Sequence, residues 1–232
     1  MRNLSLSFLY KNLYKTCKKI FGLATYENIE YGEKDSNFYD RTFTEDESWK
    51  SHYTKSPYYF CWTVIIDRLR RAGAKSILEI GCGSGQLACA IRDAKIVNSY
   101  CGFDFSKARL QQARKVCSEF KFELINVFET DLFEKLSYDT AISTEFLEHV
   151  ERDLEVVEKL RTGTRFIGTV PNFPFVSHVR HFLSCEEVAE RYGKYFQDFT
   201  VTPLLANDKG KKFFIIEGIK KSLDEILNQS DS

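Results

Sequence analysis

Residues Ser76 to Gln86, with the sequence SILEIGCGSGQ, decide the fold of this chain. The first five form a short run rich in apolar and β-branched residues, the pattern of a strand buried inside a parallel sheet. Glycines follow at alternate positions, and an Ala/Leu-rich helical pattern then continues to Ala94. A strand, a glycine turn and a helix form the first half of a nucleotide-binding βαβ unit. Glycines at such a turn let a ligand approach the main chain closely.

The spacing of the glycines indicates which ligand the turn accepts. A dinucleotide site has the pattern G-x-G-x-x-G, which places a pyrophosphate on the helix N-terminus. Here the third glycine comes one residue earlier, and an acid precedes the first glycine by two positions. This E-x-G-x-G-x-G pattern resembles motif I of the class I S-adenosylmethionine (SAM) methyltransferases; an ordinary glycine-rich turn is the alternative. The resemblance implies that the cofactor-binding residues of this turn are Glu79, Gly81, Cys82, Gly83 and Gly85.

Length and composition favour one neutral, intracellular domain. The 232 residues suffice for a single well-buried core. Basic and acidic residues number 33 each, so no global nucleic-acid signature is present. Seven cysteines without a C-x-x-C pair fit the reduced thiols of a cytoplasmic protein. No apolar run approaches the roughly 18 residues that a membrane-spanning helix requires.

A second strand is predicted over Ser99–Phe103 and ends at Asp104. An acid at this strand end, about 20 residues beyond the glycines, is where the ribose hydroxyls of a nucleotide are held. A carboxylate suits the task because it accepts both hydroxyl protons. Helix capping is the alternative role for Asp104, but Ser106 is available as the cap of the next helix. We therefore predict cofactor contacts for Asp104 and for its neighbour Phe105.

Further strands complete the expected sheet. In the resembled family, the loop after the third strand carries an acid that binds the adenine amino group, beside an apolar residue. The resemblance assigns these roles to Asp131 and Leu132. It also implies a Rossmann-like α/β fold, a seven-stranded mostly parallel sheet with helices on both faces, over residues 74–222, followed by a polar tail at 223–232. The remaining strands are predicted at 120–127, 138–143, 165–170, 196–204 and 212–219.

The sequence E-x-x-E-H follows the fourth strand, at the sheet edge where ligands of open α/β folds bind. Glu145, Glu148 and His149 form a candidate cluster for Mg²⁺ or Mn²⁺. The same letters occur in ubiquinone-synthesis O-methyltransferases and in metal-dependent methyltransferases of the 3′-terminal ribose 2′-hydroxyl of small RNAs. The latter add a later histidine, for which His178 and His181 are the candidates. Many relatives carry these letters without a metal, and there the Glu and His contact SAM or the acceptor instead; this alternative makes Glu145 a cofactor contact.

The segment after the fifth strand resembles the small-molecule branch of the superfamily, in which it faces the acceptor. It contains a Pro-Asn pair ending at Asn172 and an H-x-R-x-F-like stretch around Arg180. We predict that these two residues contact the acceptor, with Arg180 holding an anionic group. An alcohol needs a general base near neutral pH, for which His149, His178 and His181 are the candidates.

The N-terminal part, residues 1–73, matches no family pattern and is interpreted as a helical extension and cap. Met1–Leu23 is basic and amphipathic, so it either touches a membrane surface or, as we prefer, packs on its own domain. Residues 26–59 appear loop-like, followed by a helix that ends at Gly73. The aromatic residues of this part that are predicted to contact SAM or the acceptor, with plain packing as the alternative, are Tyr39, Trp49, His52, Tyr53 and Tyr58.

These observations predict a SAM-dependent methyltransferase that modifies a hydroxyl on a small molecule or glycan precursor. RNA 3′-terminal ribose 2′-O-methylation, which requires a metal, and non-catalytic SAM binding are the alternatives. An NAD-dependent oxidoreductase would share the fold, but the glycine spacing disfavours it. Nucleic acid is not the expected partner, because the net charge is zero.

Overall fold

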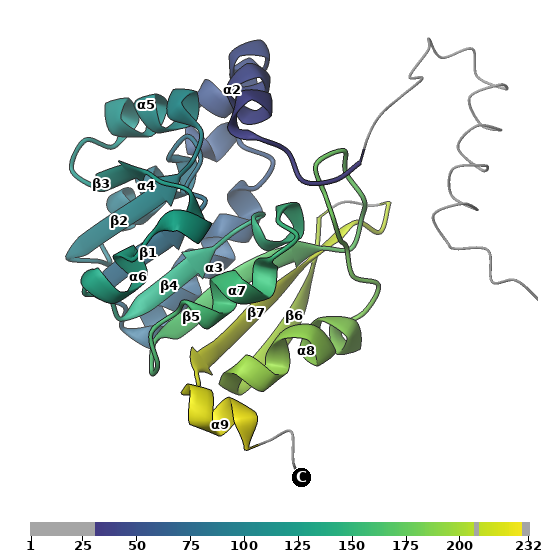
Figure 1. Cartoon of the computed structure of the whole chain (residues 1–232). Coiled ribbons are helices and arrows are strands. Elements are labelled where there is room, and N and C mark those ends of the chain that lie inside the picture. The colour runs from purple at the N-terminus through teal and green to yellow at the C-terminus, as the bar shows by residue number, and fades with distance from the viewer. Residues whose placement is uncertain (1–30, 207–208, 229–232) are drawn as a thin grey trace, which may run out of the picture. The chain divides into compact units, whose positions relative to one another are not determined.

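The computed structural model describes residues 31–206 and 209–228. Its centre is a seven-stranded sheet of order β3-β2-β1-β4-β5-β7-β6 (Figure 1). All neighbouring strands pair in parallel except β7, which is antiparallel to both β5 and β6. This confirms the predicted fold class. The strands are β1 (Ser76–Ile80), β2 (Ser99–Asp104), β3 (Lys121–Leu124), β4 (Thr140–Ser143), β5 (Arg165–Pro171), β6 (Phe196–Leu205) and β7 (Lys212–Lys220).

Helices cover both faces of the sheet, and each face has its own apolar core. Side chains alternate along β1, so Ile77 packs in one core and Leu78 in the other. One core is closed by α3 (Tyr59–Ala72), α4 (Gln86–Ala94) and α5 (Lys107–Val116). The other is closed by α6 (Leu132–Lys135), α7 (Asp153–Glu158) and α8 (Cys185–Tyr192).

The strand order places a ligand crevice at one edge of the sheet. The chain runs outward from β1 through β2 to β3, and then returns to β4 on the other side of β1. In open α/β sheets, ligands bind outside the carboxyl ends of the strands at such a reversal point. The segments that follow β1, β2, β4 and β5 therefore meet at this edge.

The structure differs from the sequence prediction at both ends of the described chain. The stretch expected to be loop-like contains helix α2 (Ser36–Glu45), whose first turn is capped by the Asp35 side chain. Phe38, Tyr39 and Phe43 recur along α2, but only Phe43 is buried, so the helix contributes little to the cores of the sheet. The predicted polar tail contains α9 (Leu223–Leu227), which begins with a reciprocal Ser222–Glu225 capping box.

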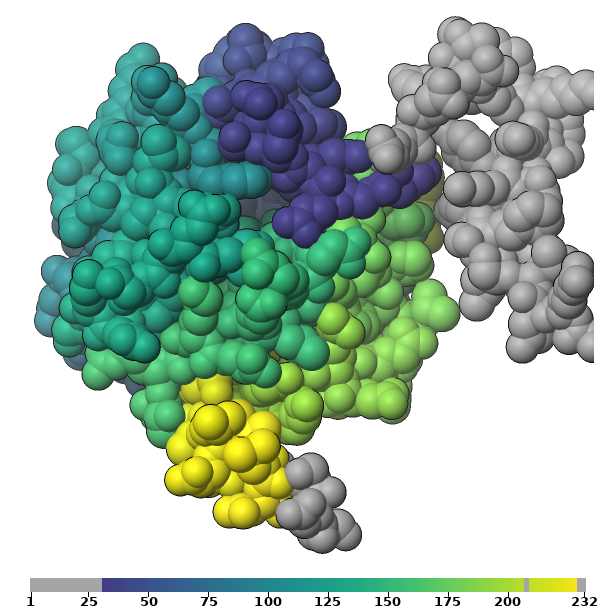
Figure 2. All heavy atoms as spheres, in the orientation of Figure 1, coloured from purple at the N-terminus to yellow at the C-terminus, as the bar shows by residue number. Residues whose placement is uncertain are grey.

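Residues 31–45 form a layer over the functional edge. The Asp40 carboxylate accepts hydrogen bonds from Ser106 Oγ and Ala108 N, at 2.6 and 3.0 Å, which docks α2 on the start of α5. Farther upstream, Gly32 N donates to Val176 O in the loop after β5. Figure 2 shows this segment in purple, running along the surface from α5 toward the green loops.

Two predictions about the N-terminal part and the membrane remain limited by the described range. The basic segment Met1–Leu23 lies outside the described residues, so its contact with a membrane surface or with the domain stays a prediction. Among the helices of residues 31–206 and 209–228, none combines the length and the apolar character needed to cross a bilayer.

Candidate active site

A cavity of about 820 Å³ opens at the carboxyl edge of the sheet. Its walls come from the glycine turn, the ends of β2 and β4, the loop after β5 and the α2 layer. Most residues predicted from the sequence to contact cofactor or acceptor meet here. Those that line the cavity are Tyr39, Trp49, Tyr58, Glu79, Gly81, Cys82, Gly83, Asp104, Phe105, Glu145, His149 and His178.

The glycines of the turn serve different purposes. Gly83 has a φ of +53°, and a Cβ built there would meet no atom within 4 Å, so the backbone faces open space at the cavity. A Cβ at Gly85 would lie 2.9 Å from Ala113 of α5, so this glycine allows α4 and α5 to pack closely. Gly83 thus leaves room for a ligand, whereas Gly85 serves the packing of the fold.

Asp104 connects the glycine turn with the ribose position. Its Oδ2 accepts a hydrogen bond from Gly83 N at 2.9 Å, and its Oδ1 accepts one from Ser106 N at 2.8 Å. Each oxygen keeps a further lone pair for a hydroxyl proton. Burial raises the pKa of Asp104 from its ordinary value, with the hydrogen bonds acting in the opposite direction. The open backbone at Gly83 and this carboxylate fit a ligand that carries a ribose, as SAM does.

Glu79 and Cys82 form the floor of the cavity. Glu79 is 2% exposed and accepts a hydrogen bond from the Tyr100 hydroxyl. Burial raises the pKa of Glu79 to about 8, which favours the protonated carboxyl at neutral pH. The neighbouring Cys82 thiol is buried, and burial raises its pKa as well. Glu79 therefore acts as a buried partner of Tyr100 beneath the glycine turn.

Glu148, His149 and His178 form a cluster whose ligand-type atoms lie within 4.8 Å of one another. The loops after β4 and β5 are paired by a hydrogen bond from Val179 N to Glu148 O at 2.8 Å. His149 Nδ1 lies 2.9 Å from Ser177 O, and His178 Nδ1 lies 3.1 Å from Phe173 O. Because a carbonyl only accepts, both Nδ1 atoms must carry the proton, which leaves both Nε2 lone pairs available.

The electrostatics of this cluster suit a cation. Glu148 is fully buried behind the cavity wall, and neither carboxylate oxygen has a hydrogen-bond partner among the described residues. Burial and the nearby Glu145 raise the pKa of Glu148 well above its ordinary value. Burial also lowers the pKa of His149 to about 3 and that of His178 to about 4, so both imidazoles stay neutral. Neutral imidazoles and an uncompensated carboxyl group are suitable ligands for a divalent cation.

The geometry corrects the predicted metal set at one position. Glu145 has a φ of +52°, and its Oε1 accepts a hydrogen bond from Thr169 Oγ1 of β5 at 3.0 Å. Glu145 is thus tied to β5, with its carboxyl still beside that of Glu148, and it is not one of the three grouped residues. The later histidine His178 takes its place beside Glu148 and His149.

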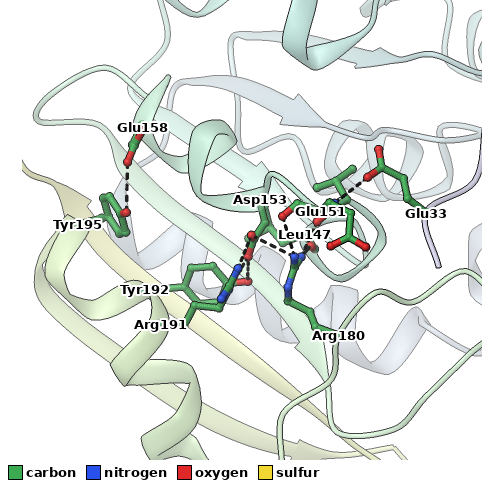
Figure 3. Close-up of polar contacts among 10 residues, drawn as sticks. Glu33, Leu147, Glu151, Asp153, Glu158, Arg180, Arg191, Tyr192 and Tyr195 are labelled. Carbon is green, nitrogen blue, oxygen red and sulfur yellow. Dashed lines mark hydrogen bonds and ion pairs between the residues drawn. The ribbon is translucent and has the colours of Figure 1, made fainter. Parts of the chain in front are cut away.

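Arg180 lies outside the cavity lining, contrary to the predicted contact with an acceptor anion. Figure 3 shows its guanidinium directed at the backbone of the loop after β4. It donates to the carbonyl oxygens of Leu147, Val150 and Glu151, and it lies 3.3 Å from Asp153 Oδ1. Because this loop carries Glu148 and His149, Arg180 positions the cluster from behind.

Asp153 anchors Arg180 in turn. The buried carboxylate receives two hydrogen bonds from Arg191, at 2.8 and 2.6 Å, and one from the Tyr192 hydroxyl at 2.7 Å. Arg191 and Tyr192 both belong to α8, so this network joins α8 to the start of α7 and to the cluster loop (Figure 3).

Several other residues that were predicted to contact the cofactor or the acceptor lie outside the lining of the cavity. The Asn172 side chain binds backbone atoms of Gly210 and Lys212, which secures the start of β7. His181 is exposed and lies outside the cavity lining. Asp131 and Leu132 also lie outside it, because Asp131 is exposed and pairs with Lys135.

His52 and Tyr53 border a separate cavity of about 230 Å³ behind the glycine turn. The Tyr53 hydroxyl donates to Asp93 of α4 at 2.8 Å. The side chain of His52 instead lies beside Thr54 within its own turn. Neither residue therefore reaches the main cavity, although both had been predicted to contact the acceptor.

Arg109 lines the cavity although the sequence did not predict it, and Trp49, one of the aromatic residues expected to contact SAM or the acceptor, lines the cavity too. Arg109 follows the N-cap residue Ser106 by three positions, and side chains of a first helical turn lean back toward the helix start. That rule directs Arg109 toward the strand edge where Asp104 stands. Trp49 lies in a short 3₁₀ turn after α2, for which the sequence carries no periodic signal.

Comparisons with known proteins indicate the kind of domain that carries this cavity. Residues 78–165 match the family model described as a methyltransferase domain. No curated protein sequence matches the chain. Among solved structures, the N-methyltransferase NodS from Bradyrhizobium japonicum WM9, bound to S-adenosylhomocysteine, superposes with a TM-score of 0.58 at 12% identity, covering 72% of this chain and 89% of NodS.

Two further methyltransferase structures share the fold as well. The methyltransferase domain of bacterial CtHen1-C has a TM-score of 0.53 at 19% identity, and covers 69% of this chain and 97% of its own. The small RNA methyltransferase HEN1 has a TM-score of 0.57 at 18% identity, and covers 69% of this chain and 25% of its own. At these identities the likeness concerns the fold.

Proposed function

We propose that the chain is a class I SAM-dependent methyltransferase that methylates a hydroxyl group with the assistance of a divalent cation. Support comes from the match of residues 78–165 to a methyltransferase-domain model and from the fold shared with solved methyltransferases. The observation that carries the proposal is the cluster of Glu148, His149 and His178 on the cavity wall. Glu148 is buried with the Glu145 carboxyl beside it, and His149 Nε2 lies 3.7 Å from its Oε1, so acidic and imidazole groups are concentrated at one point of the wall. Such groups in proteins are normally paired or coordinate a metal.

SAM supplies a methyl group attached to a sulfonium, which is a good leaving group. The protein must therefore chiefly align the acceptor and exclude water. Asp104 and the open backbone at Gly83 hold the nucleoside end, and the rings of Tyr39 and Tyr58 enclose the space beside His149. This arrangement leaves the acceptor to approach along the wall formed by His149 and His178.

The histidines are better suited to bind a cation than to remove a proton. With pKa values of about 3 and 4, His149 and His178 are weak bases at neutral pH, but their Nε2 lone pairs remain available. A divalent cation held there would act as a Lewis acid that lowers the pKa of the acceptor hydroxyl. Two nitrogen donors favour Mn²⁺ over Mg²⁺, which prefers oxygen ligands.

Metal titration tests the cluster. Chelator-treated wild-type protein should bind Mn²⁺ in a calorimetric titration, and His178→Ala should weaken that binding by roughly tenfold or more. The matched control is His181→Ala, because His181 is exposed and lies outside the cavity. Absence of binding by the wild-type protein, or equal affinity in His178→Ala, would contradict the proposed cluster.

For the acceptor, we propose a small molecule or glycan precursor. Support comes from the zero net charge of the chain and from the many aromatic rings on the cavity wall, among them Phe173 and Phe213. RNA with a free 3′-terminal ribose is the second candidate. His178 favours it, since it occupies the role of the later histidine in the ribose-modifying enzymes, and CtHen1 and HEN1 share the fold.

An acceptor assay separates these candidates. Release of S-adenosylhomocysteine is measured with a panel of sugars and hydroxylated small molecules, and with RNA that ends in a ribose or in a 2′-deoxyribose. Turnover with small molecules alone would support the first candidate. Turnover that requires the terminal RNA 2′-hydroxyl would establish the second candidate instead.

A further inference from the structure

Arg109 occupies an unusual position between the α2 layer and the cavity. Its guanidinium carbon lies 4.9 Å from the ring centroid of Tyr39 and 4.9 Å from that of Trp49, so the cation is held between two aromatic faces. Such contacts fix the plane of a guanidinium while leaving its edge available for hydrogen bonds.

The charge of Arg109 has no partner within ion-pair distance in the part of the chain that the structure describes. A guanidinium carries five N–H donors. Among residues 31–206 and 209–228, the one hydrogen bond found for the Arg109 guanidinium is a long contact of 3.5 Å from Nη2 to Thr42 Oγ1. Its Nε is buried and lacks a hydrogen-bond partner there. By contrast, Arg68, Arg92 and Arg191 each lie against a carboxylate.

An unpaired cation removed from water is costly, so its retention at a cavity wall indicates an anionic ligand. Asp104 attracts Arg109 at longer range, but both Asp104 oxygens already accept hydrogen bonds from backbone N–H groups. Asp40 also attracts Arg109 from a distance, so the guanidinium lines the cavity with no carboxylate of the described residues close enough to form an ion pair.

The surroundings of Arg109 place it between the two ends of the site. Tyr39 packs against Phe105, next to Asp104, with ring centroids 5.4 Å apart, and against His149 with a separation of 6.1 Å. Trp49 stacks on Tyr58, which also lines the cavity. Arg109 thus stands between the ribose acid and the histidine wall, the space that the methionine part of SAM must cross.

We infer that Arg109 binds the carboxylate of the methionine part of SAM. The inference rests on the proposed binding of SAM in this cavity. That carboxylate is the only anionic group of the cofactor, and a planar guanidinium binds a carboxylate through two parallel hydrogen bonds. A carboxylate or phosphate of the acceptor would have the same chemistry, and the test below distinguishes the two sources.

The experiment compares two ligands by calorimetry: S-adenosylhomocysteine and its decarboxylated analogue, which keeps the amine. Arg109→Met should weaken the binding of S-adenosylhomocysteine by about 10- to 100-fold, the effect of losing one charged hydrogen-bonding partner. It should leave the analogue within about threefold of its wild-type affinity, because the lost partner is absent from that ligand. The control is Arg114→Met, on the same helix, whose guanidinium donates to Phe122 O.

The measurements test the role of Arg109 and the binding of SAM separately. Equal losses for both ligands, or no loss for either, would overturn the role of Arg109. Unchanged cofactor affinity with a raised KM for the acceptor would assign Arg109 to the acceptor instead. If the wild-type protein failed to bind S-adenosylhomocysteine, the SAM site itself would be refuted. Thermal unfolding of each variant verifies that the fold is intact.

Discussion

Asp104 illustrates how a single side chain can serve both the backbone and a ligand. It accepts hydrogen bonds from two backbone N–H groups, which orient the carboxylate toward the cavity before any ligand arrives. A preoriented carboxylate loses less conformational entropy on binding than a mobile one.

Asp104→Asn should weaken S-adenosylhomocysteine binding by about 10- to 100-fold, because the amide cannot accept two hydroxyl protons as the carboxylate does. Calorimetry gives the affinity. The control is Asp139→Asn, since Asp139 accepts hydrogen bonds from Lys75 N and Ser76 N at the opposite end of β1. That variant should alter stability but leave the affinity unchanged; unchanged affinity in Asp104→Asn would remove Asp104 from the site.

The raised pKa of Glu79 predicts that the free energy of unfolding depends on pH. Burial raises its pKa from 4.5 to about 8 in the folded protein, so the folded state retains a proton that the unfolded state releases between these values. The contribution of the Glu79 proton to the free energy of unfolding is complete below pH 4.5, the pKa of the unfolded chain. It is lost as the pH rises to the pKa of the folded protein, about 8. The corresponding slope is at most about 1.4 kcal/mol per pH unit.

Glu79→Gln should therefore flatten the decline in the free energy of unfolding between about pH 5 and pH 8, because glutamine does not titrate. Urea denaturation at several pH values measures the slope for each protein. Identical slopes in the variant and the wild-type protein would show that Glu79 does not carry this proton.

At the scale of elements, the loops after β4 and β5 act as one unit. Val179 N pairs with Glu148 O, His149 pairs with Ser177 O, and Arg180 joins three carbonyls of the facing loop. Asp153 and α8 hold Arg180 from the far side (Figure 3). The proposed metal ligands are thus set by the pairing of two loops rather than by the turn of one helix.

Arg180→Met should weaken the binding of Mn²⁺ by about 10- to 100-fold, the usual effect of losing a group that orients metal ligands. The affinity for S-adenosylhomocysteine should stay within about twofold, since Asp104 lies on other elements. Arg152→Met is the matched control, because Arg152 is exposed and pairs with Glu155. Parallel losses of both affinities would instead indicate general disruption of the fold.

At the scale of the whole molecule, the cavity joins segments that are distant in sequence. Its walls include Tyr39, Gly83, Asp104, His149 and Phe213, which come from five separate parts of the chain. A ligand that contacts several of them binds the folded state and not the unfolded chain, so its binding energy adds to the stability of the whole domain.

S-adenosylhomocysteine at 100 times its Kd should stabilise the protein by about 2.7 kcal/mol and raise the Tm by roughly 5–10 °C. Gly83→Val should show no such shift, because its side chain would occupy open space at the cavity, and the strain of a β-branched residue at a φ of +53° should lower the Tm of the ligand-free variant. Differential scanning fluorimetry measures both effects. A shift of wild-type size in Gly83→Val would place the ligand away from the glycine turn.

The sequence by itself determined the elements whose signals are local. Apolar runs marked the strands, and glycine spacing marked the turn whose φ values other residues avoid. The position of Asp104 at a strand end followed from the same pattern, because parallel strands place their carboxyl ends at one edge. Helix α2 was not predicted, because Phe38, Tyr39 and Phe43 stand among polar residues typical of loops, and its docking on α5 through Asp40 is a tertiary contact.

The tertiary structure alone decided which polar side chains meet. Glu145 and His178 both follow neighbouring strands, β4 and β5. A left-handed backbone directs Glu145 toward Thr169, while the pairing of the two loops brings His178 to His149. Arg180 likewise turns from the predicted acceptor site to the carbonyls behind the cluster. Side-chain direction in a loop depends on backbone angles and long-range hydrogen bonds, and neither is encoded in residue spacing.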